Sequence, residues 1–250
     1  MAEEDGGLRI ADVLKTGDKL GAGAAGIREY RVPGARVCAL FLPVEPQGGD
    51  MYAIYHLRGG RAGVFVGDVS GHDFSSAIVA AEVMKYVESN RDRMREPGAF
   101  LTMMCSDLHA RLSSYQRHIT AGVFVIDPGA DSLLISTAGH PHSLVFDAQG
   151  RAPRTAGARA FPIGFEKKVS YGTCAERFAK GDVLVTFTDG VVSGKDAGGG
   201  EFGTAPLESS FASARGDVRR ALGEIEKRLK AFAPTEGTKD DRTILCVERC

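Results

Sequence analysis

Short apolar segments separated by turn residues make up most of the chain. Residues 35–44 ("ARVCALFLPV") are apolar and rich in β-branched side chains, which predicts a strand. Residues 50–69 hold two apolar runs joined at residues 58–61 ("RGGR"), which predicts a β-hairpin. The same pattern, with turn residues between the runs, predicts further strands at 118–127, 131–137, 142–147, 181–190 and 242–249.

Three other segments repeat apolar residues at helical spacing. The first follows Asp73, a residue type that caps helix starts, and the second begins at Pro97. The third lies near the C-terminal end of the chain. Their expected buried stripes are Ala77, Ala80, Ala81, Met84 and Val87, then Phe100, Leu101, Met104, Cys105, Leu108 and Leu112, then Val218, Leu222, Ile225 and Leu229. Strand meanders interrupted by paired helices predict an α+β domain in layers, with mainly antiparallel sheets.

The first 34 residues differ from the rest. Residues 8–16 have the pattern of a short helix, and a glycine-rich stretch follows at 21–26. Its Gly21, Gly23 and Gly26 match the G-x-G-x-x-G spacing of nucleotide-binding loops, but Pro33 follows too soon for the helix such a loop needs. We therefore expect residues 1–34 to be an N-terminal helix and linker, and residues 35–250 to form one domain.

Composition excludes several classes of protein. The chain has 250 residues, 43% of them hydrophobic and 25% charged, with a formal net charge of -1. This balance is typical of a soluble globular protein and gives no general attraction to nucleic acid or to an anionic membrane. No segment approaches the ~20 apolar residues of a membrane span, and the acidic start does not resemble a signal peptide. Five scattered cysteines predict neither a disulfide framework nor a zinc site, so we expect a cytoplasmic protein.

Acidic residues recur where the predicted strands begin or end. These are Asp50, Asp68, Asp189, Asp240 and Asp241. Each taken alone has an ordinary explanation as a turn or helix-capping residue. If their strand ends meet at one edge, however, the carboxylates repel one another unless cations lie between them. Oxygen ligands without cysteine or histidine favour Mg²⁺ or Mn²⁺ over zinc.

Seven motifs occur in an order that resembles a known family. They are "GGDMY", "GDVSGH", "TAGHPHSLVF", "FPIGF", "LVTFTDGV", "EFG" and "DDRT", and together they span nearly all of residues 35–249. The chain resembles the metal-dependent protein phosphatases of the PPM superfamily, in their stage II sporulation E-like bacterial branch. That resemblance implies a sandwich of two antiparallel β-sheets with helices packed outside.

The resemblance also implies a site and a reaction. The metal positions fall on Asp50, Asp68, Val69, Asp189, Asp240 and Asp241. Asp68 is expected to bridge two Mn²⁺ or Mg²⁺ ions, the Val69 carbonyl to bind one of them, and Asp189 and Asp240 to complete the shell of the other. Asp50 is expected to act directly or through water, and Asp241 is the second choice beside Asp240. A metal-bridging hydroxide would then attack phosphoserine or phosphothreonine on a regulatory protein, such as an anti-sigma factor antagonist.

The chain departs from the family pattern at a few positions. Ala53 stands where an aspartate is common, and Leu42 where many members have an arginine. These departures leave open an alternative, a degenerate domain that binds a phosphoprotein without turnover. Ser70 lacks the glycine flanks of a hydrolase nucleophile, and His72 is expected to be a structural loop residue or, as the alternative, to lie at the edge of the site. His140 either lies near the metals or stabilises a turn. No nucleic acid or membrane partner is expected, and control is left to a partner protein, homodimerisation or metal supply.

Overall fold

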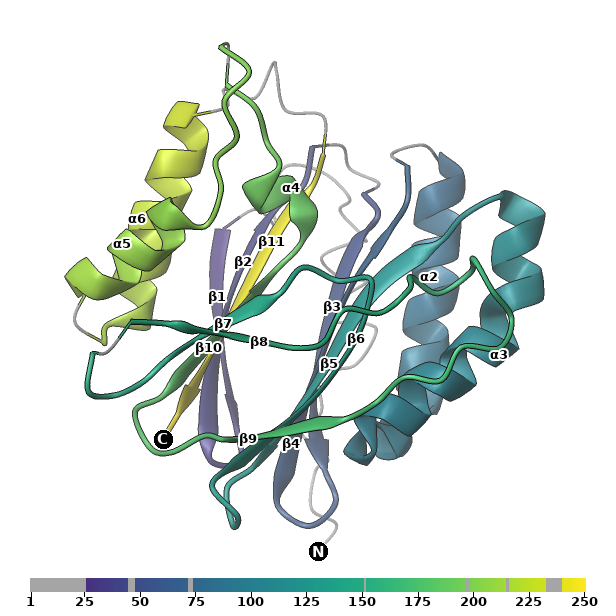
Figure 1. Cartoon of the computed structure of the whole chain (residues 1–250), viewed down its shortest axis with the longest axis horizontal. Coiled ribbons are helices and arrows are strands. Elements are labelled where there is room, and N and C mark those ends of the chain that lie inside the picture. The colour runs from purple at the N-terminus through teal and green to yellow at the C-terminus, as the bar shows by residue number, and fades with distance from the viewer. Residues whose placement is uncertain are drawn as a thin grey trace, which may run out of the picture.

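Two antiparallel β-sheets pack face to face, and helices cover the outer face of each sheet (Figure 1). The computed structural model describes residues 26–44, 48–71, 74–150, 152–196, 198–214, 216–232 and 240–250. The expected helix at 8–16 lies outside these residues, as do His72 and Asp73. The two-sheet sandwich with outer helices is the predicted fold class, and it is confirmed.

The six-stranded sheet joins segments from both ends of the described chain. Its strand β2 (Ala35–Leu42) lies beside the last strand, β11 (Arg242–Arg249), with Cys38 opposite Cys246 in the antiparallel register. In order across the sheet, its strands are β1 (Gly26–Val32), β2 (Ala35–Leu42), β11 (Arg242–Arg249), β10 (Val183–Phe187), β7 (Ser143–Phe146) and β8 (Arg154–Ala156). Strand β1 pairs with β2 along its whole length, so the sheet begins before the boundary expected at residue 35.

The five-stranded sheet is a meander with one distant edge strand. Its order is β3 (Asp50–Leu57), β4 (Arg61–Val69), β5 (Ile119–Asp127), β6 (Ser132–Ala138) and β9 (Cys174–Arg177). The hairpin predicted at residues 50–69 is confirmed as β3 and β4, with the turn at Arg58–Gly60. Strands β8 and β9 are short and were not expected, because three or four residues carry too little apolar periodicity to recognise.

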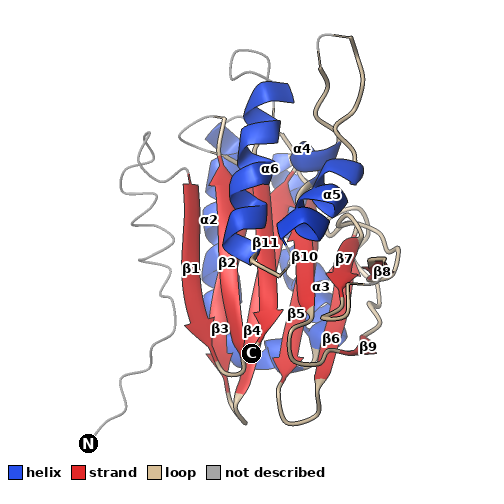
Figure 2. Ribbon diagram, turned by 90° about the vertical axis from the view of Figure 1, so that its left-hand side faces the viewer, coloured by secondary structure: helices blue, strands red, loops and turns tan. Residues whose placement is uncertain are grey.

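Each sheet carries its own helices (Figure 2). Helix α2 (Phe74–Ser89), the 3₁₀ helix η1 (Arg91–Arg95) and α3 (Pro97–Tyr115) lie on the five-stranded sheet. Helices α5 (Ala205–Ala214) and α6 (Val218–Phe232) lie on the six-stranded sheet, and the short α4 (Asp189–Val192) follows β10. None of the helices in the described ranges combines the length and apolar character needed to cross a bilayer.

The core has three layers because each sheet is buried on both faces. In β2, Val37 and Ala39 point between the sheets, whereas Cys38 and Leu40 point toward α6. Strands buried on both faces need apolar residues at successive positions, which explains the continuous apolar runs in the sequence. The predicted stripes of α3 and α6 are buried apart from Leu108, which is partly buried.

The buried face of α2 differs slightly from the predicted one. Ala81, expected inside, is exposed, while Val79 and Val83 are buried. Valine carries more apolar surface than alanine, so the helix gains more by turning its valines toward the sheet.

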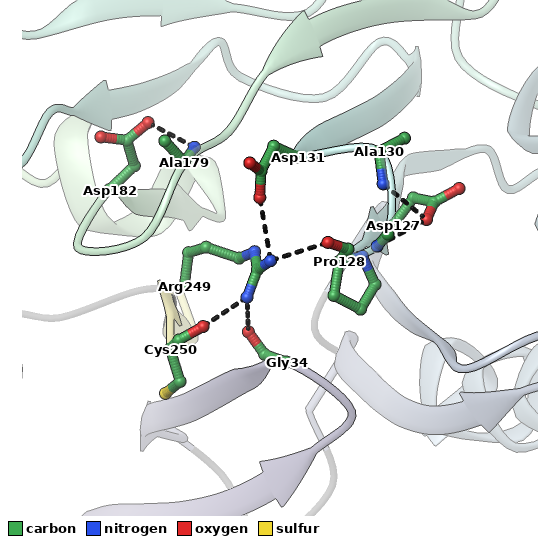
Figure 3. A network of polar contacts seen from close by, with 10 residues as sticks. Gly34, Asp127, Pro128, Ala130, Asp131, Ala179, Asp182, Arg249 and Cys250 are labelled. Carbon is green, nitrogen blue, oxygen red and sulfur yellow. Dashed lines mark hydrogen bonds and ion pairs between the residues drawn. The ribbon is translucent and has the colours of Figure 1, made fainter.

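A buried arginine ties the two sheets together where β11 ends (Figure 3). The Arg249 guanidinium donates to the carbonyl oxygens of Gly34 at 3.0 Å and Pro128 at 2.9 Å, and to the Asp131 carboxylate at 3.0 Å. Gly34 lies in the β1–β2 turn, and Pro128 and Asp131 lie in the β5–β6 turn. The Arg249 side chain is only 5% exposed. Because water hardly reaches the guanidinium, these oxygen acceptors stabilise its positive charge.

Candidate functional site

The five acids singled out in the sequence gather at the other end of the sandwich. Asp50 opens β3 and Asp68 lies near the end of β4, and the two face each other in the β3–β4 register. Asp189 opens α4 directly after β10, and Asp240 and Asp241 precede β11. Because Phe187 of β10 pairs with Ile244 of β11, these last two segments lie side by side. Figure 1 shows α4 beside the start of β11.

Burial of the acids changes stepwise from core to surface. Asp50 is 8% exposed and Asp241 is 6% exposed. Asp68 is half-buried, and Asp189 and Asp240 are exposed. The cluster therefore has an inner pair fixed in the fold and an outer group that opens to solvent, as a site that exchanges ligands requires.

Asp50 is held from the opposite sheet. Its Oδ2 accepts hydrogen bonds from Thr188 Oγ1 at 2.8 Å and from Thr243 Oγ1 at 2.6 Å. The amide of Thr243 in turn donates to Thr188 Oγ1 at 3.0 Å. The other oxygen of Asp50, Oδ1, is buried and has no hydrogen-bond partner among the described residues. A buried carboxylate oxygen without a donor is costly, so this atom needs a cation or a proton.

Asp241 and Asp240 are neighbours with different surroundings. Asp241 Oδ1 accepts from the Val44 amide at 2.9 Å, and its Oδ2 accepts from the Asp50 amide at 3.4 Å. Asp241 thus connects Val44, which follows β2, with the first residue of β3. Asp240 lies at the surface, where its Oδ1 accepts from the Asp241 amide at 3.0 Å.

Glycines beside the acids allow oxygen atoms to approach closely. A β-carbon on Gly49 would lie 2.5 Å from the Val69 carbonyl oxygen and 3.1 Å from Asp68 Oδ1. A β-carbon on Gly48 would overlap the Asp241 carboxylate, and one on Gly190 would overlap the Asp241 carbonyl. A side chain at Gly49 would push on the Val69 carbonyl, one of the expected metal ligands.

The acids also perturb one another electrostatically. Burial raises the pKa of Asp68 to about 7, with further upward contributions from Asp189, Asp240 and Asp241. Burial also raises the pKa of Asp50 well above its usual range, as do Asp68 and Asp241, although the threonine hydrogen bonds oppose the rise. Such mutual effects require the five carboxylates to lie near one another. The fold thus concentrates negative charge that a cation would relieve.

The cluster fits a hard divalent cation by its chemistry. The donors are carboxylate and carbonyl oxygens, one of them the orphaned Oδ1 of Asp50. In the described part of the chain, no three acidic, histidine or cysteine side chains already enclose a single ion position. The gathered acids are therefore arranged around the site without closing on one point.

His140 lies inside the fold beneath this end. Its Nε2 lies 3.3 Å from Thr186 Oγ1 of β10, and its Nδ1 lies 3.5 Å from Thr120 Oγ1 of β5. The His140 ring therefore bridges the two sheets. Burial lowers the pKa of His140 to about 3, so the ring is neutral at physiological pH. His140 therefore links the sheets rather than meeting solvent.

The remaining sequence candidates have structural surroundings. Ser70 exchanges two hydrogen bonds with His118, from the Ser70 amide at 2.9 Å and to Ser70 Oγ at 3.0 Å. Leu42 and Ala53 are buried in apolar clusters, and Leu42 pairs with Arg242, the residue that follows Asp241. Thr188 and Thr243 were not expected at the site, although Thr188 directly precedes Asp189 in "FTDG" and Thr243 follows Asp241 by two residues in "DDRT".

Comparison with known proteins gives a family match over most of the chain. The family model described as Stage II sporulation protein E (SpoIIE) matches residues 58–250. The phosphoserine phosphatase RsbP of Bacillus subtilis (strain 168) is 24% identical over 147 residues, which cover 58% of this chain and 36% of RsbP. The chain thus spans about a third of the length of that relative.

Solved structures share the fold. The SiaA-PP2C domain of Pseudomonas aeruginosa superimposes with a TM-score of 0.74 at 20% identity, covering 85% of both chains. The RsbU and RsbW domains of Rv1364c from Mycobacterium tuberculosis give a TM-score of 0.73 at 26% identity, covering 92% of this chain and 63% of that one. The two-sheet architecture with outer helices is therefore that of PP2C and RsbU-type domains.

Proposed function

Because the chain belongs to the stage II sporulation protein E (SpoIIE) family, we propose that it is a metal-dependent phosphatase that acts on phosphoserine or phosphothreonine of a regulatory protein. The observation that carries this proposal is the gathering of acids from four separate segments at one end of the sandwich, around a buried Asp50 oxygen without a partner. The phosphoserine phosphatase activity named for RsbP agrees with it.

The proposed ligand set divides by burial. Asp68, Asp189 and Asp240 reach the half-buried and exposed part of the cluster and are proposed as direct ligands, together with the Val69 carbonyl. Asp50 is proposed to bind through its orphaned Oδ1. Asp241 is proposed mainly to position the start of β3, because it is buried and its oxygens accept hydrogen bonds from the backbone amides of Val44 and Asp50. Two divalent cations, Mn²⁺ or Mg²⁺, when bound here would activate water and neutralise the phosphoryl charge.

The chain's own residues prepare the site for those ions. The hydroxyls of Thr188 and Thr243 fix the orientation of Asp50, as outer hydrogen bonds do for metal ligands in general. Gly49 leaves room for the Val69 carbonyl beside Asp68. The neutral His140 joins the two sheets that supply the acids. Together these contacts hold the donors close to their working positions before any ion or substrate arrives.

The proposed substrate is a phosphorylated regulatory protein, and an anti-sigma factor antagonist is the example that the family suggests. The alternative, a degenerate domain that binds a phosphoprotein without turnover, rested on Leu42 and Ala53. Both are buried among apolar side chains, and the turnover assay decides between this alternative and an active enzyme.

The test is metal-dependent hydrolysis of p-nitrophenyl phosphate and of a phosphoserine peptide. Protein stripped with EDTA should be inactive, and Mn²⁺ or Mg²⁺ should restore turnover whereas Zn²⁺ alone should not. Full activity in excess EDTA would rule out the metal mechanism. Tight Mn²⁺ binding without any turnover would favour the non-catalytic alternative.

A further inference from the structure

Two phenylalanines stand exposed on one short loop. Phe161 is 64% exposed and Phe165 is 60% exposed. Among the residues that the structure describes, these two are the large hydrophobic side chains that are exposed to solvent. Both belong to residues 159–168, which we call the FPIGF loop after its sequence motif. A pair of exposed aromatic rings on one loop is unfavourable in water and is typical of a surface that binds a partner.

Hydrogen bonds to buried or partly buried neighbours fix the backbone of the FPIGF loop. Ile163, between the two phenylalanines, is buried and exchanges two backbone hydrogen bonds with Ile119 of β5, at 2.8 and 2.9 Å. The Tyr171 hydroxyl donates to the Phe161 carbonyl at 2.9 Å, and the Cys105 thiol donates to the Glu166 carbonyl at 3.1 Å. The two rings are thus held on a fixed backbone. Little conformational entropy of the loop would therefore be lost when a partner binds.

The FPIGF loop lies next to the candidate site through a short chain of contacts. The ring of Phe165 packs on the ring of His118 with centroids 4.7 Å apart. His118 exchanges its two hydrogen bonds with Ser70, which directly follows the proposed ligand Val69. A peptide whose phosphorylated residue enters the acid cluster would therefore pass close to Phe165.

The charge of the loop complements such a peptide. Arg159, Lys167 and Lys168 are exposed, and Glu166 is the one acid between residues 159 and 168. This local positive charge attracts a phosphorylated, acidic segment, whereas the neighbouring cluster of carboxylates would repel it in the absence of metal. Apolar rings flanked by basic side chains fit a phosphopeptide with apolar residues beside the phosphate.

We propose that the FPIGF loop is the docking surface for the phosphoprotein substrate, where Phe161 and Phe165 bind apolar side chains that flank the phosphoserine or phosphothreonine. This inference rests on the proposed function and adds a specificity to it. It makes the substrate's own sequence around the phosphate, and not the phosphate alone, a determinant of turnover.

Two synthetic phosphoserine peptides of equal length and charge test it. One carries leucine at the two positions on each side of phosphoserine, and the other carries glycine there. With Mn²⁺, the wild-type protein should show a kcat/KM about 5- to 10-fold higher for the leucine peptide. Phe161→Ser and Phe165→Ser should each lower this ratio toward one, mainly through KM. Phe165→Tyr, which keeps the ring on His118, should retain the preference, and so should the control Lys230→Ser on α6.

Binding of the same peptides, labelled and followed by fluorescence polarisation, separates this inference from the proposed function. If the wild type hydrolyses neither peptide nor p-nitrophenyl phosphate, the proposed function fails, but selective binding of the leucine peptide that is lost in Phe161→Ser would still support the docking surface. An equal kcat/KM and equal binding of both peptides would overturn it. A wild-type dimer that Phe161→Ser converts to monomers, with the peptide ratio unchanged, would assign the loop to self-association and overturn it as well.

Discussion

At the scale of single residues, the acids at the candidate site differ in what surrounds them. Asp50 and Asp241 are buried and accept hydrogen bonds from threonine hydroxyls or backbone amides. Asp189 and Asp240 are exposed, and Asp68 stands between the two groups. Substitutions in the inner pair should therefore disturb the local fold, and those in the outer group should act on metal and substrate.

Amide substitution of the outer acids should separate their proposed roles. Asp68→Asn removes charge from the carboxylate expected to touch both ions, so turnover of a phosphoserine peptide should be abolished. Asp189→Asn and Asp240→Asn should weaken Mn²⁺ binding roughly 10- to 100-fold and regain some activity at high Mn²⁺. The measurement is peptide hydrolysis against Mn²⁺ concentration, with circular dichroism to confirm the fold.

The control for that series needs an acid far from the site. Asp131, in the turn between β5 and β6, is unsuitable because it pairs with the buried Arg249. Asp92 on η1 has a side chain 51% exposed and contacts Arg58 only at 3.6 Å, so Asp92→Asn should behave like wild type. Normal turnover in a folded Asp68→Asn protein would remove the basis of the assignment.

At the scale of elements, the loops that precede β3 and follow β4 depend on glycine. Gly49→Ala would place a methyl group 2.5 Å from the Val69 carbonyl oxygen, and backbone would have to move. We expect a loss of stability of roughly 1–3 kcal/mol and weaker Mn²⁺ binding. Urea unfolding and a Mn²⁺ titration measure the two effects.

A second glycine provides the matched comparison. Gly223 lies inside α6, and a β-carbon there would meet nothing within 4 Å. Gly223→Ala should raise stability by about 0.5–1 kcal/mol, because alanine loses less backbone entropy in a helix, and should leave Mn²⁺ binding unchanged. If both variants changed Mn²⁺ binding equally, the contact of Gly49 with Val69 would not be the cause.

At the scale of the whole molecule, the two sheets are joined at both ends. Arg249 makes the connection at the end away from the acids. Arg249→Met should lower the free energy of unfolding by about 2–4 kcal/mol, because the Pro128 carbonyl loses its donor and the Gly34 carbonyl keeps only the Cys250 amide. Asp131→Asn should cost much less, since asparagine still accepts a hydrogen bond and tolerates the positive φ of 44° at that position. Equal losses in the two variants, measured by urea unfolding, would show that the ion pair rather than the carbonyl contacts stabilises this end.

The acid cluster should make the stability of metal-free protein depend on pH. The pKa of Asp68 is raised from 3.8 to about 7, so between these values the folded state binds more protons than the unfolded state. Stability from this group is therefore present at low pH and is lost as the pH rises through 7. The buried His140, with its pKa lowered from 6.5 to about 3, acts in the opposite direction below pH 6.5.

Comparison with Asp68→Asn isolates the effect, because His140 contributes equally to both proteins. In EDTA, the variant should gain stability over wild type as the pH rises from 5 to 7, by at most about 1.4 kcal/mol per unit. The difference should level off above pH 7 and disappear when Mn²⁺ is added to the wild type. Urea unfolding at several pH values provides the measurement, and a difference independent of pH would contradict the raised pKa of Asp68.

Much of this molecule follows from local sequence. The hairpin of β3 and β4, the strand β11 and the buried stripe of α3 were all expected, because apolar periodicity and turn chemistry act over a few residues. The acids of the candidate site were also visible, since each interrupts an apolar run at a strand end. The family itself was indicated by its motifs, and the match over residues 58–250 confirms it.

The tertiary structure decided what depends on residues distant in the chain. It paired β2 with β11 and brought β1 into the sheet, although residues 26–32 look like a linker in the sequence. It turned Asp241 toward the amides of Val44 and Asp50 while its neighbour Asp240 faces solvent. No periodicity encodes these choices, because strand pairing and carboxylate orientation depend on which hydrogen-bond donors distant segments of the chain bring within reach.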